Sequence, residues 1–588
     1  MLNPRIYRAA FLPVFVAVVL LAFSFNSEPG ALTTTLAPAA FNGSSAFARL
    51  NGRTGLAKSY PNRSPGSPGD NGVANQVASD LSHYGFSVHR TWFEAHTVDG
   101  TRRVENVIAR QAGGSSSGRI VVISSRDAQA AGSPADLSGT ATMIELGRVL
   151  AGRTLNRSVE LISTSATAGL DGATQLAGSL GGPIDAVIVL GDVAGKSVTE
   201  PVVVPWSQGE NLAPLLLRNT AAAAVRSEAG LRPGGAHLLA QFARLALPLT
   251  LSEQGPFNAL GIPAVLLSRA GERAPAPGTP VTQGALVGLG RAALQTISAL
   301  DAGPNIPAPS AYLVYRGMSV PVGPIRLLVL ALILPVLCAA IDGFARARRR
   351  GHEVGRWIGW VLATALPFAL ASLFVVALGA TGLIPDTVPG PLDGGVLLHL
   401  AGIGEIVAAA AVLALAMFPV RAFIVRRLAM SGDPTGPGGA AAVLLVMCAV
   451  SLAIWVANPF AAALIVPALH LWMWIVAPEV RLRVPLALTM LLAGLAPVAL
   501  VILYYANQFD LGPVGVLWSG VLLIAGGGLG VAALIEWSIV AGCAVSVAVI
   551  GARAARAAAP EPVPITVRGP ATYAGPGSLG GTKSALRR

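Results

Sequence analysis

Hydrophobic and polar residues are distributed differently in two long parts of the chain. From about residue 42 to 303 short apolar runs alternate with polar, helix-forming segments, whereas after Pro324 apolar runs of about 20 residues follow one another. Short runs that are apolar on both faces are typical of strands covered by helices on each side. Runs of about 20 apolar residues can cross a bilayer as helices. The pattern therefore predicts a three-layer α/β domain followed by an all-α polytopic membrane domain.

Within the first part, the alternation predicts six strands and four helices. Residues 120–123 and 187–190 are apolar at every position, so both faces of these strands should be buried. We expect strands at 86–93, 104–110, 119–125, 159–163, 186–190 and 264–268, and helices at 73–84, 138–150, 210–229 and 284–300. A Pro-rich stretch at 303–309 closes this part of the chain.

The N-terminus carries a signal for export. Arg5 and Arg8 precede an apolar run of about 16 residues at 10–25, which is long enough for a signal sequence and marginal for a span. The Ala-rich sequence at 36–41 makes cleavage an alternative, and we favour an uncleaved signal anchor. In either case the segment that follows is exported.

The second part predicts seven further membrane crossings. The last apolar block is broken by Gly526, Gly527, Gly528 and Gly530, so it forms either two short spans or one span with a re-entrant or tilted piece. We favour one span, which gives eight crossings with the signal anchor. The apolar runs lie at about 324–343, 356–380, 395–418, 438–457, 459–477, 485–505 and 513–552.

The charges of the connecting loops predict the orientation. Arginines crowd the loops near 346–356, 421–427 and 481–483, whereas the alternate loops carry Asp386, Asp393 or Asp510 and no basic residue. Basic loops face the cytoplasm by the positive-inside rule. We therefore expect a multi-pass cell-membrane protein with its α/β domain extracytoplasmic and its Pro/Gly-rich tail cytoplasmic.

Composition excludes several function classes. The net charge is +12, but only 12% of the residues are charged, against about 25% in soluble proteins. The basic residues lie between apolar runs and in the tail, so no nucleic-acid partner is expected. The three cysteines lie in apolar stretches, which excludes a disulfide framework or a cysteine-based zinc site in the exported part. Lysine occurs only at 58, 196 and 583, a skew towards arginine that hints at a GC-rich bacterial genome.

Several motifs of the exported part resemble the M28 family of zinc aminopeptidases. In that family a buried strand ends in His-x-Asp, a loop Asp-Asn-x-Ser-Gly opens a helix, and later segments read Glu-Glu-x-Gly-Leu, Ser-Asp-His-x-Pro-Phe and Gly-Ile-Pro. The matching segments here are RSPGS at 63–67, IVVISSRD at 120–127, ADLSGTATMIELGRVL at 135–150, VELISTSATAGL at 159–170, VIVLGD at 187–192, SEQGPF at 252–257 and GIPAVL at 261–266. The resemblance spans about 230 residues and implies an M28 peptidase-like α/β fold.

The same resemblance implies two zinc ions and a glutamate base, and most of those positions are changed. Ser125 stands at the first His position, the base and ligand glutamates fall on Ala166 and Thr167, and Gln254 replaces the histidine of the late motif. No histidine occurs from 268 to 302, where the last ligand is expected. Three positions remain acidic: the resemblance makes Asp127 the residue that orients a ligand, and Asp136 and Asp192 ligand positions. The loop after Asp136 is one residue short.

Two carboxylates out of five ligands cannot hold two zinc ions, because nitrogen donors supply much of the affinity for zinc. We therefore expect no catalytic residue, no bound metal or other cofactor, and a shallow cleft near Ser125, Asp136, Asp192 and Gln254. The alternative role of the aspartates is to cap helices or bind loop amides, which suits Asp136 ahead of a helix. The histidines of this part, at 83, 89, 96 and 237, are expected on the surface.

Ionisable residues within the apolar runs are candidates for a second kind of site. Charged groups in lipid are costly and often functional. The candidates are His399 and Glu405 in one run, His470 in another, and Glu536 in the last block.

The domains expected are a signal anchor and linker (1–41), the exported domain (42–303), a linker (304–323), the membrane domain (324–558) and a disordered tail (559–588). The hypothesis is a membrane-anchored pseudopeptidase whose exported domain binds a peptide, a lipid-linked substrate or a partner protein. Its plan is similar to that of the attachment subunit of the eukaryotic glycosylphosphatidylinositol transamidase. The alternatives are an active membrane-bound zinc aminopeptidase and a transporter or lipid-handling protein with an accessory exported domain.

Overall fold

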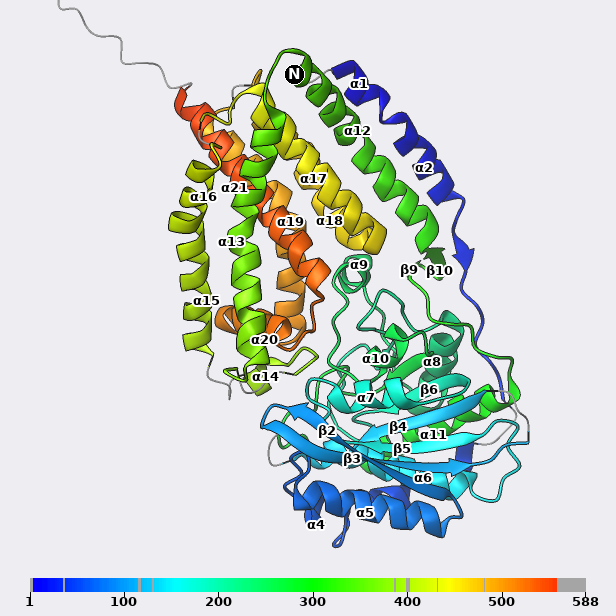
Figure 1. Ribbon diagram of the computed structural model, residues 1–588. Coiled ribbons are helices and arrows are strands. Elements are labelled where there is room, and N and C mark those ends of the chain that lie inside the picture. The colour runs from blue at the N-terminus through cyan, green and yellow to red at the C-terminus, as the bar shows by residue number, and fades with distance from the viewer. Residues whose placement is uncertain are drawn as a thin grey trace, which may run out of the picture.

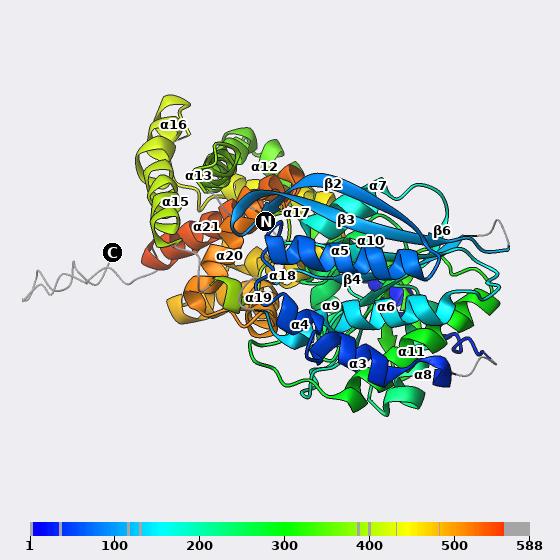
Figure 2. The same cartoon turned by 90° about the horizontal axis from the view of Figure 1, so that it is seen from below.

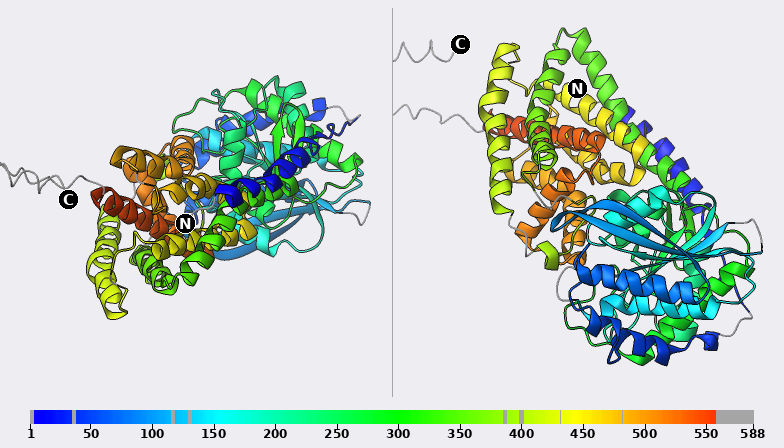
Figure 3. Two further views of the ribbon diagram at one scale, coloured as in Figure 1. Left: turned by 90° about the horizontal axis from the view of Figure 1, so that it is seen from above. Right: turned by 60° about the horizontal axis from the view of Figure 1, so that its bottom comes forward.

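The computed structural model consists of an α/β domain at one end of a group of long helices (Figure 1). Two further directions show the same arrangement, with the helices on one side and the α/β domain on the other (Figure 3). The structure describes residues 4–34, 38–114, 118–128, 132–384, 388–397, 402–430, 432–480 and 482–557.

The α/β domain is built on a seven-stranded mixed sheet with the strand order β2-β3-β5-β4-β6-β8-β7. The central strands β5, β4, β6 and β8 are parallel to one another, while β2, β3 and β7 pair antiparallel with their neighbours. The strands are β2 (Ser87–Thr97), β3 (Gly100–Gln111), β4 (Arg119–Ser125), β5 (Val159–Thr164), β6 (Ile184–Leu190), β7 (Val203–Val204) and β8 (Ala264–Leu267).

Helices cover both faces of this sheet. Successive side chains of a strand point to opposite faces, so Ile120 and Val122 pack in one core and Val121 and Ile123 in the other. The first core also contains residues of α3 (Gly43–Asn51), α4 (Leu56–Ser59), α5 (Pro68–His83), α6 (Ser138–Leu150), α8 (Leu215–Ala229) and α11 (Gln283–Ala302). The second contains residues of α7 (Asp171–Ser179), α9 (Leu238–Ala246) and α10 (Gln254–Ala259). The view from below shows α3 to α6 and α11 in front of the sheet (Figure 2). The expected three-layer architecture is confirmed.

The boundaries of several elements differ from the expectation. Helix α5 begins at Pro68, because the Ser67 hydroxyl accepts a hydrogen bond from the amide of Asp70 and proline is favoured in the first turn. Helix α8 begins only at Leu215, after Pro214. The sequence analysis missed α3, α7, α9, α10 and β7, which are short.

The linker expected at 304–323 contains regular structure. Strands β9 (Tyr312–Tyr315) and β10 (Met318–Pro321) form a hairpin, and β1 (Asn26–Ser27) pairs with β10. Strand β10 leads directly into the long helix α12 (Val322–Arg349). The chain that follows α2 and the chain that enters α12 are therefore joined in one small sheet, and the segment expected as a linker contains this hairpin.

Eight helices of the described residues are long and apolar enough to cross a membrane, as many as the loop charges and apolar runs predict. They give the chain the character of a multi-pass membrane protein. The first consists of α1 (Pro4–Ala9) and α2 (Leu12–Ala22), and a later one joins α15 (Ile403–Leu415), a π-helical turn (Ala416–Val420) and α16 (Arg421–Arg427). The others are α12, α13 (Val354–Ala380), α17 (Pro437–Ala457), α18 (Pro459–Val476), α19 (Val484–Gln508) and α21 (Val531–Ala557).

The last apolar run, at 513–552, forms one short helix and one long helix. Helix α20 (Pro513–Ala525) has 13 residues, and α21 follows after the glycine-rich break. At 1.5 Å per residue α20 reaches about 20 Å, which is short of the roughly 30 Å hydrocarbon core. One long helix and one short piece agree with the preferred interpretation.

Two segments are prominent among the contacts of the α/β domain with the helical part. The first is α9, where the side-chain amide of Asn458 donates to the carbonyl of Leu245 at 2.7 Å and the Tyr505 hydroxyl donates to the carbonyl of Leu247. The second is the segment 388–397 between α13 and α15, which includes α14 (Gly394–Leu397) and lies against Gly169. The two parts therefore share an interface that is not limited to the covalent connections.

Candidate functional site

The family positions expected from the sequence follow the ends of three neighbouring parallel strands. Ser125 ends β4, Ala166 and Thr167 follow β5, and Asp192 follows β6. Carboxyl ends of parallel strands meet at one edge of a sheet, which is where α/β domains bind ligands. The structure therefore brings these positions to a common edge.

Asp127 binds the residue that replaces one of the family's glutamates. Its carboxylate accepts hydrogen bonds from the backbone amide of Thr167 at 3.1 Å and from its hydroxyl at 2.5 Å. Burial raises the pKa of Asp127 to about 6, and nearby Asp70 acts in the same direction, while the bonds to Thr167 oppose the rise. Asp127 thus holds the loop after β5 in place. Its partner Thr167 carries a hydroxyl and cannot act as a general base.

Asp136 lies in a short 3-10 turn (Pro134–Leu137) that precedes α6. Its carboxylate lies 3.6 Å from the guanidinium of Arg63. Burial raises the pKa of Asp136 to about 7, although Arg63 acts to lower it. The expectation that Asp136 caps α6 is wrong, because Leu137 occupies the N-cap position and the helix has no side-chain cap.

Asp192 satisfies the amides of its own loop, as the alternative role predicted. One carboxylate oxygen accepts from the amides of Ala194 and Gly195 at 3.0 and 2.7 Å and from the Ser138 hydroxyl at 3.4 Å. The other oxygen is buried and has no hydrogen-bond partner among the described residues. Burial raises the pKa of Asp192 above its ordinary value.

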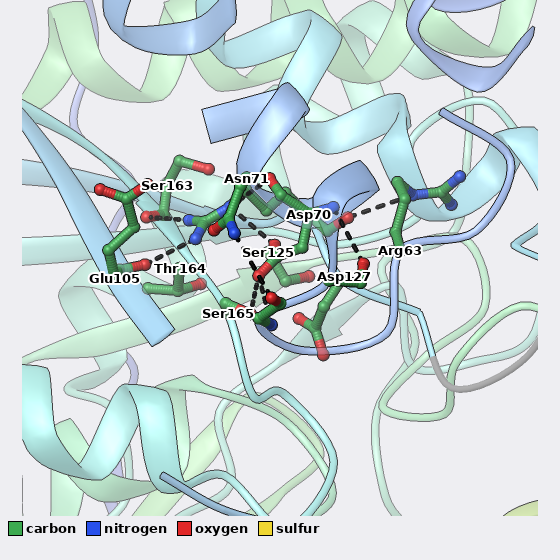
Figure 4. A network of polar contacts seen from close by, with 12 residues as sticks. Arg63, Asp70, Asn71, Glu105, Ser125, Asp127, Ser163, Thr164 and Ser165 are labelled. Atoms are coloured by element: carbon green, nitrogen blue, oxygen red, sulfur yellow. Dashed lines mark hydrogen bonds and ion pairs between the residues drawn. The ribbon is translucent and has the colours of Figure 1, made fainter. Parts of the chain in front are cut away.

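Two arginines, Arg63 and Arg126, are fully buried near these carboxylates. Figure 4 shows Arg63 in one network of polar contacts with Asp70, Asp127 and Ser165. Arg63 donates to the carbonyls of Tyr60, Arg126 and Ser133. Arg126 forms an ion pair with Asp70 at 2.8 Å and donates to the carbonyls of Glu105 and Ser163 at 2.6 and 2.9 Å. Burial lowers the pKa of Arg63, and Asp136, Asp127 and Asp70 oppose this effect.

The Arg126–Asp70 pair links the neighbouring elements of the site. Asp70 lies in α5 and also accepts from the hydroxyl of Ser165 at 2.8 Å and the amide of Gly66 at 2.9 Å. Sequence reasoning gave Arg126, Asp70 and Glu253 no role, although an arginine directly before Asp127 at the end of an apolar strand was a signal. Each group of this network is paired within the domain, which makes the network a structural element.

In the segment SEQGPF (252–257), Glu253 belongs to the buried polar cluster and Gln254 does not. The hydroxyl of Thr164 donates to Glu253 at 2.7 Å, and burial raises the pKa of Glu253 to about 7. The side chain of Gln254 is buried, and its amide donates to the carbonyl of Trp206 at 3.0 Å. Gln254 therefore secures the start of α10 against the segment before it.

The donor set does not fit zinc. Among the described residues no group of three or more His, Cys, Asp or Glu side chains is placed to hold a metal ion. The carboxylates at this edge have no imidazole beside them, and the guanidinium of Arg63 lies against Asp136. A positive charge beside a carboxylate competes with a metal ion for it, so the site is suited to internal ion pairing.

The loop after β5 has an unusual backbone and is covered by the helical part. Ala166, Gly169 and Leu170 all have positive φ, at 61°, 77° and 66°. Non-glycine residues in this region cost energy and persist only when the surroundings hold them. A side chain at Gly169 would clash with Val388, so the segment after α13 lies directly on this loop. Access to Ala166 and Thr167 is thus restricted from the helical side.

The four histidines of the α/β domain are exposed, as expected. The ring of His96 is 60% exposed, and its Nδ1 lies 3.3 Å from the carboxylate of Asp171. None of them is near enough to other donors to form a metal site within the described residues.

The polar candidates of the membrane part lie apart from one another. Glu405 is in the first turn of α15, and Glu536 lies in the second turn of α21, near the glycine-rich break. His470 bridges three helices, because its Nδ1 accepts from the Tyr7 hydroxyl at 2.7 Å and its Nε2 donates to the carbonyl of Leu332 at 2.9 Å. Since a carbonyl only accepts, Nε2 carries a proton in this geometry, and a neutral ring then accepts from Tyr7 at Nδ1. His399 lies outside the described residues.

Comparison with known proteins gives a likeness of fold. No family model matches the sequence, and no curated protein matches it. Among solved structures, an aminopeptidase from Aneurinibacillus sp. strain AM-1 is similar at a TM-score of 0.35 and 14% identity, covering 46% of this chain and 95% of that one. A zinc aminopeptidase from Bacillus subtilis gives 0.35 and 13%, covering 44% and 94%. A glutaminyl cyclase from Porphyromonas gingivalis gives 0.32 and 16%, covering 44% and 98%.

The α/β domain resembles these folds. The likeness covers under half of the chain at low identity, so it concerns the fold alone and says nothing about activity. The chemistry of the site rests on the residues described above.

The buried aspartates predict an inverted pH dependence of stability. The pKa of Asp136 is raised from 3.8 to about 7, so its contribution is fully present below pH 3.8 and is lost as the pH rises through 7. The substitution Asp136→Asn removes this cost, and we expect it to stabilise the protein by about 2 kcal/mol at pH 8. Thermal unfolding of the variant and of the unaltered chain in detergent, at pH 8 and at pH 3.5, measures the difference in stability.

The same variant supplies its own control. At pH 3.5 Asp136 is protonated in the folded chain and largely protonated in the unfolded chain, so Asp136→Asn and the unaltered chain should unfold within about 0.5 kcal/mol of each other. A variant that is less stable at pH 8 would show that Asp136 is held ionised, by Arg63 or by a metal ion, and would contradict the prediction.

Proposed function

We propose that this protein is a membrane-anchored pseudopeptidase, whose exported α/β domain has kept an M28-like fold and serves in binding. The ligand class is a peptide, a lipid-linked substrate or a partner protein in the extracytoplasmic space. The observation that carries the proposal is the buried guanidinium of Arg63 beside Asp136. Because Arg63 pairs with Asp136, the carboxylates at this edge of the sheet are neutralised within the protein and are less suited to hold metal ions.

Two further observations support a non-catalytic role. The hydrogen bonds from Thr167 engage both oxygens of Asp127, and Thr167 itself has no carboxylate to take a proton from water. Val388 and the segment that follows it cover the loop at Gly169, so a substrate would have to displace part of the helical domain. A binding surface therefore has to lie elsewhere on the exported domain.

The fixed attachment of the two parts suits a role in binding and assembly. Hydrogen bonds join α9 to α18 and α19, and rings of Phe242 and Phe460 pack edge to face at 5.6 Å between their centroids. A rigid attachment holds the exported domain at a constant position relative to the bilayer in which the eight helices are proposed to lie. The similarity of plan to the transamidase attachment subunit remains a prediction.

The alternatives receive less support. An active aminopeptidase needs nitrogen ligands and a base that the described cluster lacks. A transport pathway needs polar groups that face one another within the helices, whereas Glu405 and Glu536 lie near helix ends and His470 is engaged by Tyr7 and Leu332.

Metal content and peptidase activity test the proposal together. The full chain would be purified in detergent with zinc available, and bound zinc and turnover of a panel of aminoacyl reporters would be measured. We expect less than one zinc ion per chain after dialysis and no turnover above that of an Asp136→Ala variant. Two zinc ions per chain, with turnover that Asp136→Ala abolishes, would overturn the proposal in favour of an active peptidase.

A further inference from the structure

A cavity of about 420 Å³ lies at the β7 edge of the α/β domain. It is open to solvent and is bordered by the segment that follows β1, by α8, by the loop before α9 and by the turn between β9 and β10. Its lining comprises Glu28, Pro29, Gly30, Ala31, Val203, Arg218, Asn219, Ala222, Arg226, Pro233, Gly234 and Gly317. None of these residues belongs to the carboxylate cluster at the ends of β4, β5 and β6. The cavity is therefore a separate feature, and its role does not depend on the function proposed above.

The charged groups of the cavity favour an anion. Arg218 and Arg226 are eight positions apart on α8, which places them about two turns apart on one side of the helix. Glu28 is the acidic residue of the lining, and its carboxylate accepts a hydrogen bond from the side-chain amide of Asn219 at 3.1 Å. The lining therefore carries two guanidinium groups and one carboxylate, and that carboxylate is already hydrogen-bonded to Asn219.

The two arginines differ in how they are held. Arg218 is half-buried and interacts with the hydroxyl of Tyr312, which restrains its guanidinium. Arg226 is exposed and forms no hydrogen bond or ion pair with the described residues. A fixed guanidinium and a free one form a pair of donors that a phosphate group can bridge, since guanidinium matches phosphate geometry.

Small residues leave the backbone of the cavity accessible. A Cβ atom added at Gly30 or Gly317 would meet nothing within 4 Å, so both glycines border open space. The volume exceeds that of a single phosphate ion and lies within the roughly 300 to 1,000 Å³ of small-molecule sites. It therefore has room for a phosphate together with a glycerol-sized group.

The position of the cavity links it to the apolar helices. Glu28 to Ala31 follow β1 a few residues after α2 ends, and Gly317 lies in the hairpin that leads into α12. Both helices are among the eight that can span a membrane. The sheet of β1, β9 and β10 stands at the foot of these two helices (Figure 1). A ligand in the cavity would thus lie near the ends of two helices that can span a membrane.

We propose that this cavity binds a phosphate ester through Arg218 and Arg226, with a glycerol-sized group beside the phosphate. Anionic phospholipid headgroups and soluble phosphate esters share this chemistry. Because the cavity lies near the ends of α2 and α12, which can span a membrane, we favour the lipid headgroup as the ligand.

Binding to the full chain in detergent tests the proposal. The probes are short-chain phosphatidylglycerol, short-chain phosphatidylcholine, glycerol 3-phosphate and inorganic phosphate, titrated separately by calorimetry. We expect phosphatidylglycerol to bind, and Arg226→Glu to weaken its binding by about tenfold or more, because a charge-assisted hydrogen bond is lost and a repulsive charge is added. Arg226→Lys keeps the charge and should retain most of the affinity.

A matched variant separates local from general charge effects. Arg53→Glu makes the same charge change at an exposed position of the exported domain between α3 and α4, and it should leave binding unchanged. Saturation by glycerol 3-phosphate with the same dependence on Arg226 would identify a soluble ester as a sufficient ligand, whereas binding of phosphatidylglycerol alone would identify the lipid. Equal binding of phosphatidylcholine, equal losses in Arg53→Glu and Arg226→Glu, or no binding of any phosphate probe would overturn the proposal.

Discussion

Replacing Arg244 with methionine should lower the free energy of unfolding by about 3 to 5 kcal/mol. The guanidinium is buried and pairs with Glu272 at 2.9 Å, and it also donates to the carbonyl of Leu249 at 2.6 Å. Burial alone would lower the pKa of Arg244, and the charge of Glu272 outweighs this effect, so the pKa is raised. The substitution leaves the Glu272 carboxylate buried without its cation, and an uncompensated buried charge is strongly destabilising.

The aromatic surroundings add to the expected loss. Four rings lie 5.2 to 5.7 Å from the guanidinium carbon, and those of Tyr504, Tyr505 and Phe509 belong to or adjoin α19. The fourth is Trp206 of the α/β domain. Cation–π contacts are worth most when the cation is desolvated, as it is here. Arg244 therefore joins the α/β domain to the helical part, and its loss should also weaken their attachment.

Thermal unfolding of the full chain in detergent measures this effect, and Arg273→Met is the matched control. Arg273 also joins the two parts, through Asp510 at 3.2 Å, but the side chain of Asp510 is 72% exposed. An exposed ion pair contributes about 0 to 1 kcal/mol, so this control should unfold almost as the unaltered chain does. Equal losses in the two variants would contradict the prediction. The double variant Arg244→Met, Glu272→Met should recover much of the loss, because no unpaired charge stays buried.

The sequence predicted those parts of the fold that depend on local pattern. The continuous apolar run at 120–123 belongs to a strand covered on both faces, and it packs alternately in two cores as expected. The eight apolar helices follow from length and hydropathy in the same way. Short helices such as α3 and α10 were missed, because four to nine residues give little periodicity and their stability comes from packing.

The candidate site could be predicted only in outline. The motifs located its residues at the strand ends, since order along the chain fixes those positions. The partner of Asp136 could not be found, because Arg63 lies far away in the sequence and reaches it only through the packing of the loop before α5 against the loop after β4. The same holds for Val388, which covers Gly169 from the helical part. Long-range contacts of this kind leave no periodic signal in a single sequence.

The second large effect is expected at the centre of that network. Arg126→Met should lower the free energy of unfolding by about 3 to 5 kcal/mol, because Asp70 would remain fully buried with its nearest cation gone. The guanidinium also satisfies the carbonyls of Glu105 in β3 and Ser163 in β5, and both would lose a donor. Urea unfolding of the full chain, followed by the signal of the α/β domain, measures the loss.

Arg110→Met is the appropriate comparison for this variant, since Arg110 also pairs with a carboxylate of the same sheet. Its side chain is 56% exposed and lies 3.7 Å from Glu160, so its loss should cost about 1 kcal/mol or less. If Arg126→Met were tolerated as well as Arg110→Met, the buried network would not hold the strand ends together. If Arg126→Met is destabilised as expected, then the carboxylate edge of the sheet is an internal support of the α/β domain, which is the structural basis of the proposed non-catalytic role.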